Sequence, residues 1–201
     1  MPETIDYYFT VTSPWSYLGD ARFRELVSHA GRQIDYKPVD MHAVFSVSGG
    51  LPLAERPAQR KAYRLAELRR WRDRLSVPMN IEPAYFPAPS DTAMRMVVAA
   101  KLDGAGADQL GVLVHAFMRA VWAEEKNIAD KDTLQAIASD AGFDGAKLLA
   151  RAQDQDTGAA YQAYTDEAIT AGVFGAPTYI VDGEMFWGQD RLDFVQERLS
   201  A

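Results

Sequence analysis

TIDYYFTVTSPWSYL, residues 4–18, joins two different sequence patterns. Residues 4–10 alternate and are rich in β-branched and aromatic side chains, which predicts a strand. Ser13 followed by Pro14 predicts a helix start, because serine caps free N–H groups and the fixed φ of proline suits the first turn. Apolar residues then recur at helical spacing as far as Ala30. Ser13 is therefore expected between a strand and a helix.

Outward from this junction, residues 33–39 alternate again. The first forty residues thus predict a β-α-β unit, with parallel strands and a right-handed crossover by default. Residues 46–52 contain two glycines and a proline and are expected to form a loop. Beyond them the period becomes helical. Helices are expected over residues 56–75, 92–102, 108–123, 132–141, 145–151 and 158–171.

Strand character returns near the C-terminus. Residues 178–181 and 184–187 are joined by an Asp-Gly pair, which is a strong hairpin signal. A last helix is expected over residues 191–199, opened by Asp190.

The order β-α-β, helical block, β-β-α is the thioredoxin arrangement. We therefore predict an α/β, thioredoxin-like fold with a large all-helical domain inserted. Residues 1–45 and 172–201 are expected to form the thioredoxin-like domain, and residues 46–171 the inserted helical domain.

Composition excludes several functions. The chain has 201 residues, a formal net charge of −7 and no cysteine. The charge argues against nucleic acid as the main partner, and the lack of cysteine excludes disulfides, thiolate nucleophiles and thiolate zinc sites. The three histidines lack metal-ligand spacing, so no metal is expected. The start lacks a signal-peptide pattern and no apolar run of about 18 residues occurs, so a cytoplasmic protein without membrane attachment is expected.

Ser13 and Ser16 occupy the positions where a redox thioredoxin fold carries Cys-x-x-Cys. The start of a helix stabilises a thiolate there, through free N–H groups and the positive end of the dipole. A Ser13 hydroxyl can donate to an anionic sulfur brought by a ligand. The alternative is that Ser13 is an ordinary helix cap.

Pro177 immediately precedes the third predicted strand, where the thioredoxin fold carries a cis-proline facing the helix start. If Pro177 is cis, the Ala176 backbone can pair with an extended peptide in the manner of strand addition. The alternative is a trans proline that only sets the turn into the strand.

Several motifs carry a resemblance to a known family. They are YFTVTSPWSYL (8–18), FGAPTY (174–179), FWGQDRL (186–192), Arg70-Trp71, and Ala120-Val-Trp. Together they resemble the 2-hydroxychromene-2-carboxylate isomerases and the kappa-class glutathione transferases, over nearly the whole chain.

The resemblance implies glutathione as the bound thiol. Ser13 matches the serine that stabilises its thiolate. Ala176 and Pro177 would hold the cysteinyl backbone, and Gln189 and Asp190 would receive the γ-glutamyl end. A carboxylate facing an α-ammonium is electrostatically sensible.

The family also implies a basic residue for the glycyl carboxylate, which Arg60 or Lys61 could supply. The predicted helix 56–75 carries many other basic residues. Most are expected to form a solvated face with ion pairs to Glu67 and Asp73, while one or two near the loop could attract anions.

The implied activity is a glutathione-dependent isomerisation of 2-hydroxychromene-2-carboxylate, or a related intermediate of aromatic compound catabolism, to trans-o-hydroxybenzylidenepyruvate. A small aromatic carboxylate is thus the expected substrate, and the family suggests a homodimer. One alternative is a kappa-like glutathione transferase or peroxidase acting on other electrophiles. Another is a non-catalytic, peptide-binding thioredoxin-like protein.

Overall fold

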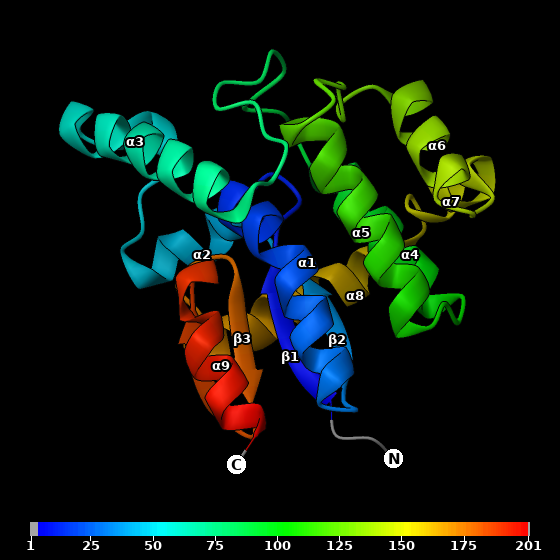
Figure 1. Cartoon of the computed structure of the whole chain (residues 1–201). Coiled ribbons are helices and arrows are strands. Elements are labelled where there is room, and N and C mark those ends of the chain that lie inside the picture. The colour runs from blue at the N-terminus through cyan, green and yellow to red at the C-terminus, as the bar shows by residue number, and fades with distance from the viewer. Residues whose placement is uncertain (1–3, 201) are drawn as a thin grey trace.

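The computed structural model describes residues 4–200 and shows a sheet with helices on both faces and a helical region above it (Figure 1). In chain order the elements are β1 (Thr4–Phe9), α1 (Pro14–His29), β2 (Gln33–Pro38), α2 (Met41–Ser48), the 3-10 turn η1 (Leu53–Glu55), α3 (Ala58–Leu75), α4 (Asp91–Leu102), α5 (Ala107–Trp122), α6 (Lys131–Asp140), α7 (Gly145–Arg151), α8 (Gln155–Thr170), β3 (Thr178–Val181), β4 (Glu184–Trp187), the 3-10 turn η2 (Gln189–Arg191) and α9 (Leu192–Leu199).

The sheet has the order β2-β1-β3-β4. β1 pairs in parallel with β2, which sets Tyr7 opposite Tyr36. It pairs antiparallel with β3, which sets Tyr7 opposite Tyr179, and β3 continues antiparallel into β4. Between β2 and β3 the regular elements are all helical. The predicted thioredoxin-like fold with a helical insertion is therefore confirmed, and β3, β4 and α7 have the predicted bounds.

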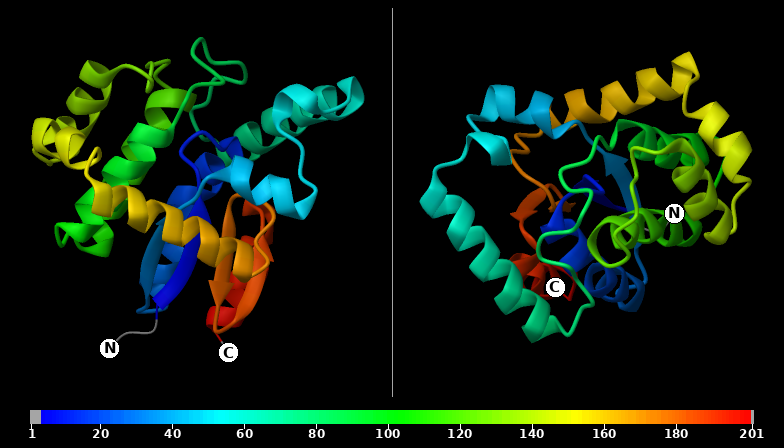
Figure 2. Two further views of the ribbon diagram at one scale, coloured as in Figure 1. Left: turned by 180° about the vertical axis from the view of Figure 1, so that it is seen from behind. Right: turned by 90° about the horizontal axis from the view of Figure 1, so that it is seen from above.

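The two faces of the sheet carry different helices. α1 and α9 lie on one face, and α8 crosses the other (Figures 1 and 2). Alternation along β1 explains this, because neighbouring side chains point to opposite faces. Tyr7 packs against Phe23 of α1, with ring centroids 5.0 Å apart, whereas the Tyr8 hydroxyl donates to Glu167 of α8 at 3.0 Å.

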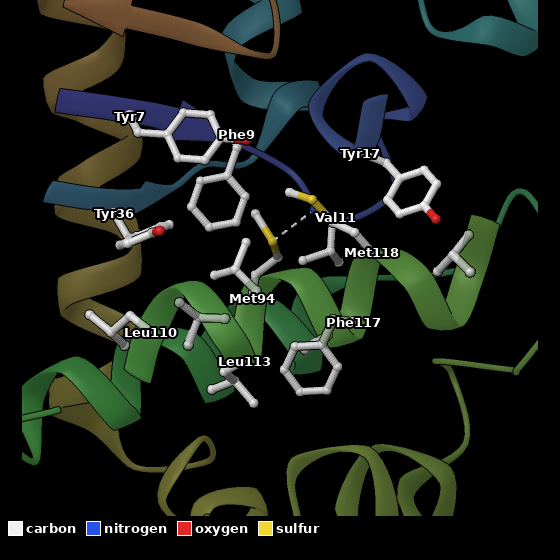
Figure 3. Close-up of a cluster of buried hydrophobic side chains, with 14 of the residues drawn as sticks. Tyr7, Phe9, Val11, Tyr17, Tyr36, Met94, Leu110, Leu113, Phe117 and Met118 are labelled. Carbon is white, nitrogen blue, oxygen red and sulfur yellow. Dashed lines mark hydrogen bonds between the residues drawn. The ribbon is translucent and has the colours of Figure 1, made fainter. Parts of the chain in front are cut away.

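The helical insert shares its core with the sheet. Buried side chains of α4 and α5, including Met94 and Phe117, belong to one cluster with Tyr7 and Phe9 (Figure 3). The thioether of Met94 also accepts from the backbone N–H of Val11 at 3.4 Å. The insert therefore holds the segment that leads into Ser13.

Several details differ from the sequence predictions. Helix α8 begins at Gln155 rather than at residue 158. Helix α2 was not expected, and its last residues, 46–48, fall in the predicted loop. The signal is weak because the helix buries only Val44, although Asp40 caps it by accepting from the His42 N–H at 2.8 Å. Helix α3 begins at Ala58 rather than Arg56, because Pro57 disfavours helical backbone in the residue before it.

The expected division at residue 45/46 lies inside α2, and residues 1–3 and 201 of the expected domains lie outside the described chain. The division itself stays a prediction. In residues 4–200, no helix combines the length and the apolar character that crossing a bilayer requires.

Candidate functional site

Ser13 is the N-cap of α1. Its φ of −78° and ψ of 119° are extended, and its Oγ accepts from the Ser16 N–H at 3.2 Å. The same hydroxyl donates to the carbonyl oxygen of Ala176 at 3.1 Å. The predicted cap is confirmed, and the hydroxyl also reaches across to a segment 163 residues away.

The second serine of the motif does not face the site. The Ser16 side chain is fully buried, and its Oγ has no hydrogen-bond partner within residues 4–200. Of the two hydroxyls at the start of α1, only that of Ser13 meets the proline loop.

The Ala176-Pro177 peptide bond is cis, which favours the first of the two alternatives for Pro177. Thr178 fixes the loop, because its hydroxyl donates to the Gly175 carbonyl at 2.8 Å. Pro177 is buried, whereas Ala176 is half-exposed. Ala176 therefore offers backbone to the outside directly beside the Ser13 hydroxyl.

The turn after β4 is tied to the same loop. The Gly188 N–H donates to the Pro177 carbonyl at 2.9 Å. Gly188 has a φ of 102°, and an added Cβ would lie 2.5 Å from a carboxylate oxygen of Asp190, so glycine is required here. Asp190 is exposed and pairs with Arg191 at 3.0 Å. Gln189 is only 2% exposed.

Gln189 therefore has a packing role in this structure. Its Oε1 is buried without a hydrogen-bond partner in the described chain. Its Cβ lies so close to α1 that a Cβ on Gly19 would approach it to 2.7 Å. Of the predicted pair, the Asp190 carboxylate is accessible, whereas the Gln189 amide is not. Nothing in the sequence signals that Gly19 supports this turn.

Arg60 and Lys61 stand apart from the other five predicted site residues. Both lie in the first turn of α3, and Lys61 Nζ donates to the Ala54 carbonyl at 2.7 Å. Arg60 is exposed. Neither forms a hydrogen bond or ion pair with the other five anywhere in the described chain.

The predicted ion pairs on this helix are present: Arg70 pairs with Glu67, and Arg72 pairs with Asp73 at 2.8 Å. Sequence analysis did not single out Arg64. It is half-buried, with its guanidinium carbon 5.4 Å from the ring centroid of Phe86.

The fold and this geometry define a thioredoxin-fold protein with a hydroxyl at the helix start, facing a cis-proline loop. The profile of the DSBA-like thioredoxin domain matches residues 4–200. The chain belongs to the DsbA-like thioredoxin domain family.

Individual relatives are more specific than the family. The chain is 33% identical over 200 residues to a 2-hydroxychromene-2-carboxylate isomerase of Sphingobium xenophagum, covering 99% of both chains. It is 24% identical to glutathione S-transferase kappa 1 of Rattus norvegicus, covering 96% of this chain and 89% of that protein. A solved structure of a 2-hydroxychromene-2-carboxylate isomerase superposes with a TM-score of 0.85 at 24% identity, covering 98% and 95% of the two chains. The resemblance stated from the motifs is thus confirmed, and these relatives indicate an enzyme.

Proposed function

We propose that the protein is a glutathione-dependent isomerase of 2-hydroxychromene-2-carboxylate or a closely related aromatic carboxylate. The observation that carries the proposal is the Ser13 hydroxyl, at the start of a 16-residue helix and 3.1 Å from the Ala176 carbonyl oxygen. In a chain without cysteine, this arrangement suits a thiol carried by a ligand. The isomerase and kappa transferase relatives support the choice of thiol and reaction.

The donors and acceptors present fit a γ-glutamyl tripeptide. The half-exposed Ala176 can pair with the cysteinyl backbone as a neighbouring strand would. The exposed carboxylate of Asp190 suits the α-ammonium group. Arg60 or Lys61 would take the glycyl carboxylate, as the family implies.

Binding would also redirect the Ser13 proton. A hydroxyl has one proton to donate, and in the ligand-free protein it goes to the Ala176 carbonyl. A peptide N–H on that carbonyl replaces the serine as donor. The Ser13 hydroxyl can then donate to sulfur, and the N-terminus of α1 adds its positive potential. Both effects favour the thiolate over the thiol.

Bound glutathione would supply a nucleophilic sulfur that adds to the conjugated substrate reversibly, so that rotation about the former double bond becomes possible. The chain's part is to hold the sulfur ionised at Ser13 and to orient the substrate beside it.

The test is an assay of the purified protein with glutathione and 2-hydroxychromene-2-carboxylate. We expect isomerisation only when glutathione is present. Ser13→Ala should lower kcat by about 10²-fold, as for loss of one donor to a developing anion, and raise the pKa of the bound thiol measured by thiolate absorbance.

Ser13→Ala also removes a helix cap, which by itself costs about 1 kcal/mol of stability. Asp130→Ala is the matched control, because Asp130 caps the remote helix α6 by accepting from the Thr133 N–H at 2.8 Å. It should lose similar stability and keep full activity. Turnover that needs neither glutathione nor Ser13 would sink the proposal. Conjugation of a chloroaromatic without isomerisation would instead favour a kappa-like transferase.

A further inference from the structure

Three arginines lie near one another at the start of α3: Arg60 and Arg64 are one turn apart on the helix, and Arg56 is in the extended segment just before it. We call them the arginine row. Arg56 and Arg64 are half-buried and Arg60 is exposed. In residues 4–200, none of the three has a carboxylate oxygen within ion-pair distance. The contrast with Arg70 and Arg72, which pair with acidic residues on the same helix, is clear.

The guanidinium of Arg64 lies on an aromatic surface. Its carbon is 5.4 Å from the ring centroid of Phe86 and 5.9 Å from that of Trp122, and the two ring centroids are 4.7 Å apart. The rings therefore attract the cation through their faces. None of the five guanidinium N–H donors of Arg64 forms a hydrogen bond within the described chain, so they remain available to an acceptor from outside.

The charge of this row is poorly compensated. Burial first, and then the nearby charge of Arg56, lower the pKa of Arg64 to about 10, with Glu82 opposing them only in part. Burial and the charge of Arg60 likewise lower the pKa of Arg56. A half-buried cation without an anionic partner destabilises the folded state, and a bound anion would relieve this.

The arginine row lies at the same end of the molecule as Ser13. α3 and the start of α1 are both at the end away from the chain termini, and α3 approaches α1 with its last turns (Figure 1). The segment 76–90 connects them. Tyr17 lies one helical turn after Ser13, and its hydroxyl donates to the Pro78 carbonyl of this segment at 2.7 Å. Phe86 of the same segment contacts the Arg64 guanidinium with its ring face.

We propose that Arg64, backed by Arg56, binds the carboxylate of the aromatic substrate. This inference rests on the proposed function and adds to it the group that recognises the anionic end of the substrate. A planar guanidinium can donate two parallel hydrogen bonds to a carboxylate, and within residues 4–200 no hydrogen-bond acceptor competes for Arg64. Arg60, which is more exposed, remains free for the glycyl carboxylate that the family implies.

The test measures binding of chromone-2-carboxylate, a flat and stable analogue, in the presence of glutathione by titration calorimetry. We expect Arg64→Met to weaken binding of the acid by about 10-fold to 100-fold, the range of a charge-assisted hydrogen-bonded pair. Binding of the methyl ester, which lacks the charge, should not change. Arg64→Lys should regain part of the loss. Arg69→Met is the matched control, because Arg69 is exposed on the same helix, and it should bind the acid as the unaltered protein does.

Equal weakening of acid and ester would mean that Arg64 only supports the aromatic pair, and would overturn the inference. A loss of glutathione affinity with the acid unaffected would also overturn it. The proposed isomerisation is tested separately by turnover of the unaltered protein. If that protein binds the acid through Arg64 but does not isomerise the substrate, the carboxylate site stands and the proposed reaction fails.

Discussion

Gly19 shows how a single hydrogen in place of a side chain positions the candidate site. It lies on α1 where η2 crosses, and an added Cβ would be 2.7 Å from Gln189 Cβ and 3.0 Å from the Tyr179 hydroxyl. Because Gln189 is almost fully buried and Tyr179 belongs to the core, neither partner can withdraw cheaply. The contact fixes the turn that presents Asp190.

We therefore expect Gly19→Ala to lower the free energy of unfolding by about 1–3 kcal/mol, the usual cost of overpacking. It should also weaken glutathione binding, because the Asp190 turn must move. Denaturant unfolding and glutathione titration measure the two effects. Gly106→Ala is the control, since an added Cβ there meets only Gln109 Oε1, at 3.9 Å. Unchanged glutathione affinity in a destabilised Gly19→Ala protein would show that this turn does not contribute to glutathione binding.

At the same scale, sequence reasoning found Ser13 and Pro177 because each has a strong local signal, a cap before a proline and a proline before a strand. It could not show that the Ser13 proton goes to the Ala176 carbonyl. That hydrogen bond depends on how two distant segments meet, not on either segment alone.

Among the elements, the corner between α7 and α8 is held by Arg151. This side chain donates to Asp156 at 2.5 Å and 2.6 Å and to Asp103, after α4, at 3.2 Å. The arginine hydrogen bonds lower the pKa of Asp156 to about 2. One arginine therefore ties α4 to the junction of two later helices.

A lowered carboxyl pKa in the folded state means that the ionised form stabilises the protein. This stabilisation is present above the unfolded pKa of about 3.9 and is lost as the pH falls towards 2. We expect Asp156→Asn to melt at a lower temperature than the unaltered protein at neutral pH. The difference should shrink between about pH 4 and pH 2, because the stabilisation from ionised Asp156 is lost there, whereas the other carboxyls titrate in both proteins and cancel. A difference that does not change with pH would show that the Asp156 charge contributes nothing.

Most elements could be predicted because their signals are local. Caps, glycines and apolar periodicity mark α1, α7, β3 and β4. α2 was missed because it buries only Val44 and its end falls in the stretch with two glycines and a proline that favours a loop. Packing of Val44 in the cluster beneath α8 holds it. The 3-10 turns likewise leave no periodic pattern.

Across the whole molecule, one hydrophobic core joins the sheet to the helical insert. Phe117 of α5 and Tyr7 of β1 are both fully buried in the same cluster (Figure 3). We therefore expect the two parts to unfold together, although the insert follows its own helical period in the sequence.

Phe117→Ala should lower the free energy of unfolding by about 3–5 kcal/mol. Hydrogen exchange should show the same loss of amide protection in β1 and in α5, because both belong to one cooperative unit. Val112→Ala is the control on the same helix. Val112 is 48% exposed, so its truncation should change stability by less than about 0.5 kcal/mol. Faster exchange confined to the helical insert would show two independent units.

The sequence by itself determined the order of strands and helices, the serine cap of α1 and the family, because these depend on local patterns and on motifs that survive as short runs. Only the tertiary structure decided which of these residues meet. It set Ser13 against Ala176, buried the Gln189 side chain, left Asp190 exposed, and placed Arg64 over two rings from later parts of the chain. The physical reason is that such contacts are fixed by packing between elements, whose geometry no local run of residues specifies.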